Sequence, residues 1–275
     1  MIDSELKNQR NSTGCALCLR IEVLMESHFF PKSAYKHVRT KGETEDSPIH
    51  VSAGDGDAFY SDNQVTMKLL CSSCEQLFSK HGESVVARLW STRKGFPFLE
   101  LIKEAKLEST DRSAELFHSA SFPDGVLRGL YYFAVSMIWR AHVWSRSNAK
   151  LTKVDLGPYE KIFRDLLLSH GEMRRVKLIV TINVHRSING VMTTPVSRKM
   201  FGRHAYMFEI LGIKFHLYVG GDDKGDFSET FNYMGSNVLV MTSREAEAAS
   251  HNAMKSLVLG GITPRGRLAK ESVGK

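Results

Sequence analysis

The chain has 275 residues and a mass of 30.9 kDa, with 42% apolar and 24% charged residues. This composition is that of an ordinary globular protein and excludes a fibrous or largely disordered chain, and the length suffices for one large domain or two modest ones. The formal net charge of +7 is compatible with a polyanionic partner such as nucleic acid.

We expect neither a membrane-spanning segment nor a secretory signal in this sequence. Residues 1–10 are polar and lack the apolar core of a signal peptide. The most apolar helical stretch, residues 129–139, is too short to cross a bilayer and is followed at once by Arg140. We therefore expect a cytoplasmic protein that makes no contact with a membrane.

A first module is expected over residues 10–95. Its regular segments are a strand over 20–25, a short helix over 32–38, a strand over 65–71 and a helix over 72–90. Residues 40–62 are rich in Gly, Asp and Ser and are predicted to form a long loop. A break in the last helix is expected near Gly82.

The second region, residues 96–275, is expected to be helical first and then mixed α/β. Helices are predicted over 124–146, 157–171 and 244–259, and strands over 175–184, 204–212, 213–221 and 237–242. Gly212 is expected in a hairpin turn, and Ser243 is expected to cap the last helix. Residues 263–275 are predicted to be loose.

Charge is unevenly distributed along the chain. Residues 1–90 carry 10 Lys and Arg against 12 Asp and Glu, a net −2, whereas residues 91–275 carry 27 against 18, a net +9. Contacts between cationic side chains and phosphates release counterions and supply much of nucleic-acid affinity. If DNA is the partner, we expect the second region to provide most of the attraction. A basic domain without a polyanionic partner is the alternative.

The four cysteines form two pairs, Cys15-x-x-Cys18 and Cys71-x-x-Cys74, separated by 52 residues. Two residues between thiolates let one tight turn present both sulfurs to the same ion, and four thiolates complete the tetrahedral shell of a structural Zn²⁺. In a reducing compartment such pairs favour zinc over disulfides, and no cysteine is left over. Two independent redox motifs are the alternative.

The order of motifs resembles that of the HNH endonuclease family. A CxxC pair precedes "SHFFPK" at residues 27–32, a polar loop with Asn63 follows, and "LLCSSCE" then opens a helix. The resemblance covers about residues 13–82, a quarter of the chain. It implies an α+β protein with an N-terminal zinc-supported treble clef, the ββα-metal module, followed by a helical and mixed α/β region.

The resemblance also implies roles for matched residues. His28 would be the general base that takes a proton from the attacking water, and Asn63 would hold the loop that orients His28. A catalytic Mg²⁺ or Mn²⁺ would offset charge on the leaving oxygen of DNA. The Zn²⁺ would do no chemistry and would stabilise a module too small to supply much core, through Cys15, Cys18, Cys71 and Cys74.

Two positions depart from the family's pattern. Ser27 stands where the family has an acidic or histidine metal ligand, and Glu75 stands where it has a histidine after the last cysteine. Glutamate is a fair oxygen ligand for Mg²⁺ or Mn²⁺, whereas a hydroxyl is a poor one. We therefore expect Glu75 to be the ligand of a catalytic ion. Further negative charge could come from Asp55, Asp57 or Asp62.

The favoured function is metal-dependent cleavage of DNA phosphodiester bonds. The alternative is a non-catalytic zinc-binding module for nucleic-acid or protein recognition, in which Ser27 and Glu75 mark a decayed metal site. A third possibility places the function in the basic second region, whose sequence has no P-loop, no GxGxxG and no Ser-His-Asp signature. His81 is expected at the surface or in a cap, from where it could approach a phosphate. The aromatic residues of 131–144 are expected in the core.

Overall fold

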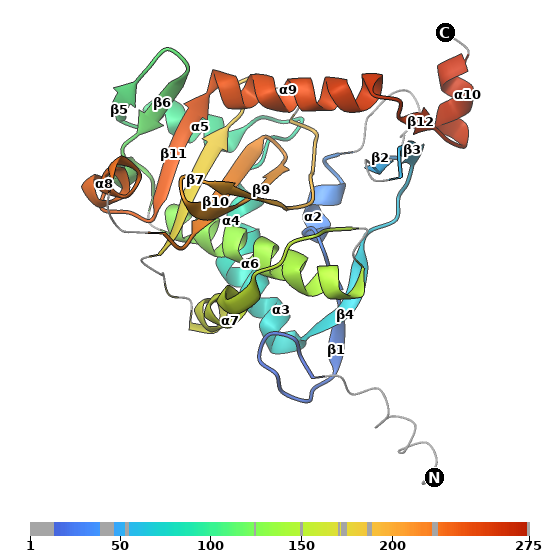
Figure 1. Ribbon diagram of the computed structural model, residues 1–275, viewed down its shortest axis with the longest axis horizontal. Helices are drawn as coiled ribbons and strands as arrows, with labels where there is room; N and C mark the ends of the chain where they lie inside the picture. The colour runs from blue at the N-terminus through green and yellow to red at the C-terminus, as the bar shows by residue number, and fades with distance from the viewer. Residues whose placement is uncertain are drawn as a thin grey trace.

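A computed structural model describes residues 14–38, 47–52, 55–123, 125–148, 151–169, 171, 175–185, 189–221 and 225–273. Over these ranges the protein has the mixed α+β fold expected from the sequence (Figure 1). The larger part is a seven-stranded sheet with helices on both faces, and a two-stranded sheet lies to one side of it. In these same ranges we find no helix with the length and apolar character needed to cross a bilayer.

The N-terminal part is a pair of antiparallel strands followed directly by a helical segment. Its elements are β1 (Leu24–His28), β4 (Thr66–Cys71), α3 (Ser72–Phe78), the π-helical turn η1 (Ser79–Glu83) and α4 (Ser84–Val86). The strand and helix expected over residues 65–90 are thus confirmed. The break expected near Gly82 is a change of helical type, because the chain passes through the π turn without leaving the helix.

The strand expected over residues 20–25 begins later than predicted. β1 starts at Leu24, which is in register with a β4 residue. Ahead of it the chain makes a tight turn, in which the N–H of Leu19 (φ 61°) donates to the carbonyl of Cys15 at 2.8 Å. The apolar side chains whose alternation suggested a strand are exposed instead; Val23, for example, is 85% exposed.

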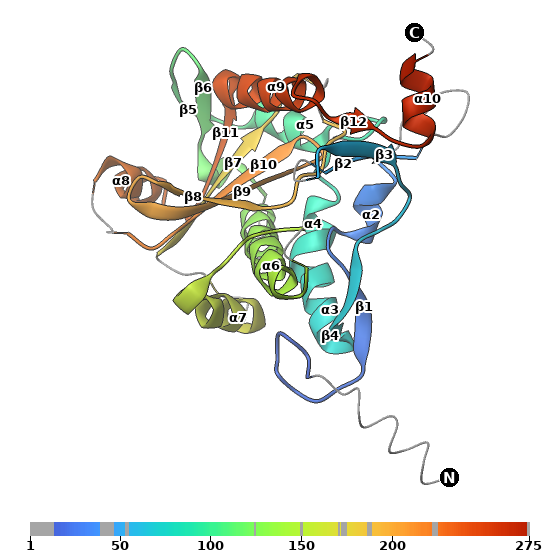
Figure 2. The same ribbon diagram turned by 45° about the vertical axis from the view of Figure 1, so that its right-hand side comes forward.

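The insertion between β1 and β4 pairs with the C-terminal end of the chain. The elements concerned are α2 (Lys32–Tyr35), β2 (Ile49–Ser52), β3 (Asp57–Tyr60), β12 (Thr263–Pro264) and α10 (Arg267–Val273). α2 confirms the predicted short helix. β3 lies between β2 and β12 (Figure 2), and Arg265 forms an ion pair with Asp57 at 2.9 Å. The loop predicted for 40–62 and the loose tail predicted for 263–275 are therefore wrong where these elements occur.

The order of the described strands in the large sheet is β5-β6-β11-β7-β10-β9-β8. They are β5 (Leu107–Thr110), β6 (Ala114–Phe117), β7 (Val176–Ile182), β8 (Val196–Met200), β9 (Arg203–Ile210), β10 (Ile213–Val219) and β11 (Val238–Ser243). β7 and β11 are parallel, and the other pairs described are antiparallel. β7, β9, β10 and β11 were predicted. Gly212 makes the β9–β10 turn at φ 87°, a conformation that glycine adopts readily.

Helices cover both faces of this sheet, as Figure 2 shows. The remaining elements are α5 (Pro97–Glu104), η2 (Ser119–Ser121), α6 (Val126–Ser147), η3 (Gly157–Tyr159), α7 (Glu160–Ser169), α8 (Asp226–Tyr233) and α9 (Arg244–Leu259). The three predicted helices correspond to α6, α7 and α9. The predicted cap is also confirmed, since the hydroxyl of Ser243 accepts from the N–H of Ala246 at 3.1 Å.

Helix α6 lies between the large sheet and the N-terminal helical segment. Phe133 packs against Phe215 of β10, and Trp139 packs against Phe78 of α3, with ring centroids 5.5 and 5.9 Å apart. The expected core position of these aromatic residues is confirmed. One hydrophobic cluster includes buried residues from both parts of the chain. The division into modules at 10–95 and 96–275 stays a prediction.

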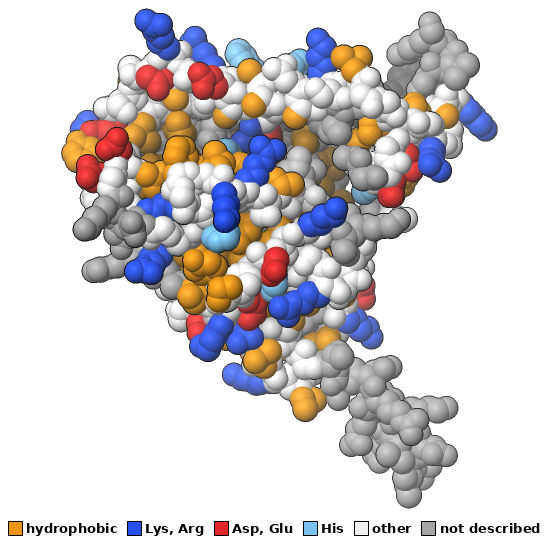
Figure 3. All heavy atoms as spheres, viewed as in Figure 1, with side chains coloured by type: hydrophobic (Ala, Val, Ile, Leu, Met, Phe, Trp, Pro, Cys, Tyr) orange, Lys and Arg blue, Asp and Glu red, His pale blue; other side chains and the backbone are white. Residues whose placement is uncertain are grey.

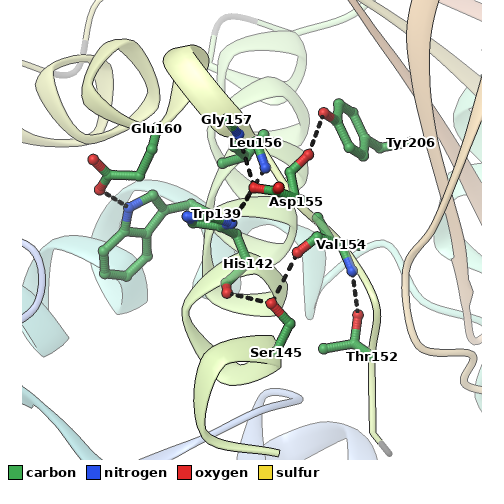
Figure 4. Close-up of polar contacts among 10 residues, drawn as sticks. All are labelled: Trp139, His142, Ser145, Thr152, Val154, Asp155, Leu156, Gly157, Glu160 and Tyr206. Carbon is green, nitrogen blue, oxygen red and sulfur yellow. Dashed lines mark hydrogen bonds and ion pairs between the residues drawn. The ribbon is translucent and has the colours of Figure 1, made fainter. Parts of the chain in front are cut away.

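Polar contacts fix the segment that leads from α6 to α7 (Figure 4). Trp139 Nε1 donates to Glu160 Oε1 at 3.2 Å, which ties α7 to α6. The hydroxyl of Tyr206 donates to the carbonyl of Asp155 at 3.1 Å, which ties the same segment to β9. His142 lies buried beside it, and this burial lowers the pKa of its imidazole. The segment between α6 and α7 is therefore held to both α6 and β9.

Candidate metal centre and the adjacent cavity

The ligand atoms of the four cysteines lie within 4.8 Å of one another. Cys15 and Cys18 belong to the tight turn ahead of β1, Cys71 is the last residue of β4, and Cys74 lies in the first turn of α3. The pairing of β1 with β4 brings the two pairs together, because Leu24 is in register with Cys71. The structure thus unites the two motifs that the sequence separates by 52 residues.

The spacing of these sulfurs suits a tetrahedral ion. The Sγ atoms of Cys18 and Cys71 are 3.9 Å apart. Zn–S bonds of about 2.3 Å place sulfurs roughly 3.8 Å apart in a tetrahedron. Cys15, Cys71 and Cys74 are buried and Cys18 is half-buried, so solvent has little access to the cluster. The cluster could therefore hold a metal ion such as zinc.

Backbone N–H groups favour the thiolate form of Cys15. Burial raises the pKa of the Cys15 thiol, but hydrogen bonds from the backbone of Cys18 and Cys71 outweigh burial and bring the pKa below its ordinary value. One of these bonds joins the N–H of Cys71 to Cys15 Sγ at 3.3 Å. Burial raises the pKa of Cys74 instead. A divalent cation would remove the mutual repulsion that opposes four thiolates at this distance.

A cavity of about 370 Å³ opens next to this cluster. Its lining residues are Met25, His28, Lys32, Ser72, Glu75, Gln76, Ser79 and Glu83. The lining residues between positions 72 and 83 belong to the N-terminal helical segment. They are spaced about three or four residues apart, which places their side chains on one face of a helix. His28 is the last residue of β1, and Glu75 directly follows Cys74. His28 and Glu75, both identified from the sequence, therefore line the same cavity.

A hydrogen bond connects Ser27 with Glu75. The Ser27 hydroxyl donates a hydrogen bond to Oε1 of Glu75 and accepts one from the N–H of Leu70 at 3.3 Å. Ser27 is buried, with 2% of its surface exposed, and it is not among the residues described as lining the cavity. The buried serine thus orients the glutamate.

Arg140 is a site residue that the sequence analysis missed. Arg140 belongs to α6, and its side chain is buried. Nη1 donates to the carbonyls of His28 and Phe29 at 2.8 and 2.7 Å. Nη2 forms an ion pair with Glu83 at 2.7 Å. Arg140 therefore fixes both the end of β1 and a wall of the cavity. The signal that could have identified it is a charged residue directly after the apolar stretch 129–139.

Among the described residues, Asn63 is not one that lines this cavity. It is exposed ahead of β4, and its backbone N–H donates to the hydroxyl of Ser61 at 3.2 Å. The same segment does contact the chain after His28, since the N–H of Phe29 donates to the carbonyl of Val65 at 2.8 Å. The role predicted for Asn63 stays a prediction. The aspartates considered as further sources of charge also lie outside the lining, namely Asp55, Asp57 and Asp62.

Within the described ranges, the cysteine cluster is the only group of three or more His, Cys, Asp or Glu side chains whose ligand atoms converge. The cavity at His28 offers no comparable set. No family model, curated protein or solved structure matches this chain. What the chain does must therefore be inferred from the cluster and the cavity beside it.

Proposed function

We propose that the protein is a metal-dependent nuclease that cleaves phosphodiester bonds in DNA. The observation that carries the proposal is that His28 and Glu75 line one cavity beside four converging cysteines. Two antiparallel strands followed at once by a helix also agree with the ββα-metal module that the motifs resemble. His28 ends the first strand, and Glu75 lies in the first turn of the helix.

In this proposal the cysteine cluster holds a structural Zn²⁺ in a treble clef. Four thiolates fill a tetrahedral shell, so no position remains for water or substrate at that ion. The zinc would fix the start of α3 against the turn that contains Cys15 and Cys18. Because Glu75 follows Cys74 directly, the same anchoring would place the Glu75 carboxylate relative to His28.

His28 is the proposed general base. A neutral imidazole accepts a proton from a water molecule as the water oxygen attacks phosphorus and one phosphorus–oxygen ester bond breaks. The leaving oxygen takes up a proton from solvent. The hydrogen bond from Arg140 to the carbonyl of His28 keeps the backbone beneath the imidazole in place.

Glu75 is the proposed ligand of a catalytic Mg²⁺ or Mn²⁺. When bound, such an ion supplies positive charge that stabilises the leaving oxygen. Mg²⁺ commonly binds proteins through one or two carboxylates and completes its shell with water and substrate phosphate. A single oriented carboxylate in an open cavity suits that mode of binding. Glu83 contributes less, because its carboxylate is paired with Arg140.

The charge of the chain supports DNA as the substrate. Residues 91–275 carry a net +9, and Lys32 lines the cavity itself. On the face seen in Figure 3, Lys and Arg side chains recur over the sheet and over the helices below it. Phosphates of a bound duplex would be attracted by such side chains.

The test compares cleavage of supercoiled plasmid by the wild type, His28→Ala and His251→Ala, each with Mg²⁺ or Mn²⁺. Loss of a general base costs on the order of 10²–10⁴-fold in rate. We expect that loss for His28→Ala, with zinc content and thermal unfolding unchanged. His251 is exposed on α9, and His251→Ala is expected to match the wild type.

Cleavage that survives in His28→Ala would overturn the assignment of the base. Absence of plasmid cleavage by the wild type with every divalent ion tested would favour the second candidate, a non-catalytic zinc-binding recognition module. That candidate is favoured by one observation, namely that no three ligand side chains of the described residues converge at His28.

A further inference from the structure

A second cavity, of about 190 Å³, opens where the N-terminal helical segment meets the start of α6. Its lining residues are Lys80, His81, Val85, Gly125, Arg128, Gly129, Tyr131, Tyr132 and Gly171. We propose that this cavity binds a phosphate group of the DNA backbone close to the scissile bond. The inference rests on the proposed nuclease function for the source of the phosphate, and on the cavity itself for the chemistry.

The cavity has the charge that a phosphate requires. Lys80, His81 and Arg128 line it, and no Asp or Glu of the described residues does. Lys80 and Arg128 are exposed, so their ammonium and guanidinium groups can reach a ligand that enters from solvent. Arg offers a planar fork of donors and Lys a compact charge, and the two together are a common pair for phosphate.

Three glycines leave part of the wall without side chains. At Gly129 the close packing of α4 requires this, because a Cβ there would lie 2.5 Å from Cγ1 of Val85. Gly125 adopts φ 84° at the N-cap of α6, and the first turn of this 22-residue helix contains no acidic residue. The partial positive charge of the helix N-terminus therefore adds to that of Lys80 and Arg128.

Residues of the π turn η1 line both this cavity and the one at His28. Ser79 and Glu83 line the first cavity, whereas Lys80 and His81 line the second. A π turn contains more residues than an α turn and is frequent at functional sites, because the extra residue redirects the side chains around it. η1 also packs closely on α6, since a Cβ on Gly82 would lie 3.1 Å from the Cα of Phe133. One DNA strand that crosses η1 would thus place phosphates in both cavities.

The experiment measures duplex binding by fluorescence anisotropy at several salt concentrations, in a His28→Ala background so that the DNA stays intact. The variant is Lys80→Ala/Arg128→Ala. The control is Arg112→Ala/Lys153→Ala, which removes the same charge from two exposed positions elsewhere. Each lost phosphate contact is expected to lower the slope of log K against log salt by about one. Because the cavity holds one phosphate, we expect a slope smaller in magnitude by about one and an affinity at least tenfold weaker than that of the control.

An equal loss of DNA affinity in the two double variants would overturn the proposal, because the loss would then reflect net charge and not this cavity. The single variants Lys80→Gln and Arg128→Gln repeat the measurement if the double variant unfolds at a lower temperature. A titration with inorganic phosphate separates the two sources of the ligand. If the variant loses affinity for inorganic phosphate but not for DNA, the cavity binds a free phosphate and the assignment to the DNA backbone is wrong.

The same variants separate this proposal from the nuclease assignment. In an otherwise wild-type background, Lys80→Ala/Arg128→Ala is expected to raise KM for plasmid and leave kcat within a factor of about three, because the lost contacts act equally on substrate and transition state. A wild type that binds DNA through this cavity but never cleaves it would refute the nuclease and retain the phosphate site. Cleavage with unchanged KM in the variant would refute the phosphate site alone.

Discussion

Ser27 on β1 donates a hydrogen bond from its hydroxyl to the carboxylate of Glu75 on α3. These are the two positions at which the sequence motifs differ from the HNH pattern that they resemble, and a hydrogen bond joins them. The serine is itself held by the N–H of Leu70 at 3.3 Å, so its hydrogen points toward the glutamate. The two departures therefore form one unit, in which a buried hydroxyl orients the carboxylate that faces the cavity.

This pairing predicts the effect of Ser27→Ala. Residues that orient a metal ligand typically contribute about 10–100-fold to metal affinity or activity. We expect the Mg²⁺ concentration for half-maximal plasmid cleavage to rise by such a factor, while the rate at saturating Mg²⁺ stays within about threefold of the wild type. Ser79→Ala, at a serine that lines the cavity, is the control and is expected to change the Mg²⁺ requirement little. An unaltered Mg²⁺ requirement in Ser27→Ala would show that Glu75 needs no such orientation.

The cysteine pairs, and His28 and Glu75 as candidate residues, could be singled out from the sequence because their motifs are local. A CxxC turn and a carboxylate after the last cysteine depend on residues only a few positions apart. The strands of the large sheet that were predicted, such as β7 and β10, are apolar runs that a window of ten residues reveals.

The remaining features depend on contacts between distant segments. β3 pairs with β2 and with β12, and β12 lies more than 200 residues later in the chain. The Gly- and Asp-rich sequence around β2 and β3 resembles a loop because it carries no sign of this distant partner. Edge strand β8 is polar and mostly exposed, and it has no apolar alternation to mark it. Arg140 lies 112 residues from the carbonyl that it holds, and the packing of α6 on the N-terminal helical segment brings the two together.

Arg140→Met tests how strongly the second region supports the site. The substitution leaves Glu83 without its cation and removes the donor to two carbonyls, at a place where the guanidinium is 2% exposed. Removal of one partner from a buried ion pair typically costs about 3–5 kcal/mol. We expect urea unfolding to report a loss of that size. Arg146→Met, at an exposed position of the same helix, is expected to change stability by less than about 0.5 kcal/mol. Similar values for the two variants would contradict a structural role for Arg140.

Metal removal tests the cysteine cluster. Elemental analysis of freshly purified, reduced protein is expected to find one zinc per chain, because the cluster offers one four-sulfur site. Metal binding to such a site contributes directly to folding free energy, so a chelator or Cys71→Ser is expected to lower the unfolding temperature. Binding requires deprotonated thiols, and zinc affinity should therefore fall as the pH falls. Protein that contains no zinc when purified, or that unfolds at the same temperature with a chelator, would contradict the assignment.

His216 predicts a dependence of stability on pH that is independent of the metal centre. Burial, together with the nearby charge of Lys214, lowers the pKa of its imidazole to about 4, against about 6.5 in an unfolded chain. Between these values the unfolded state binds the proton and the folded state does not. The stability that His216 supports is thus complete above pH 6.5 and is lost as the pH falls toward 4. By this linkage the loss at pH 5 is roughly 2 kcal/mol.

In His216→Leu, the difference between the free energies of unfolding at pH 7.5 and pH 5 should shrink by about that amount. The control His251→Leu, at an exposed site, should follow the wild type. Urea unfolding at the two pH values measures both, and an undiminished difference in His216→Leu would show that this histidine is not the source of the acid sensitivity.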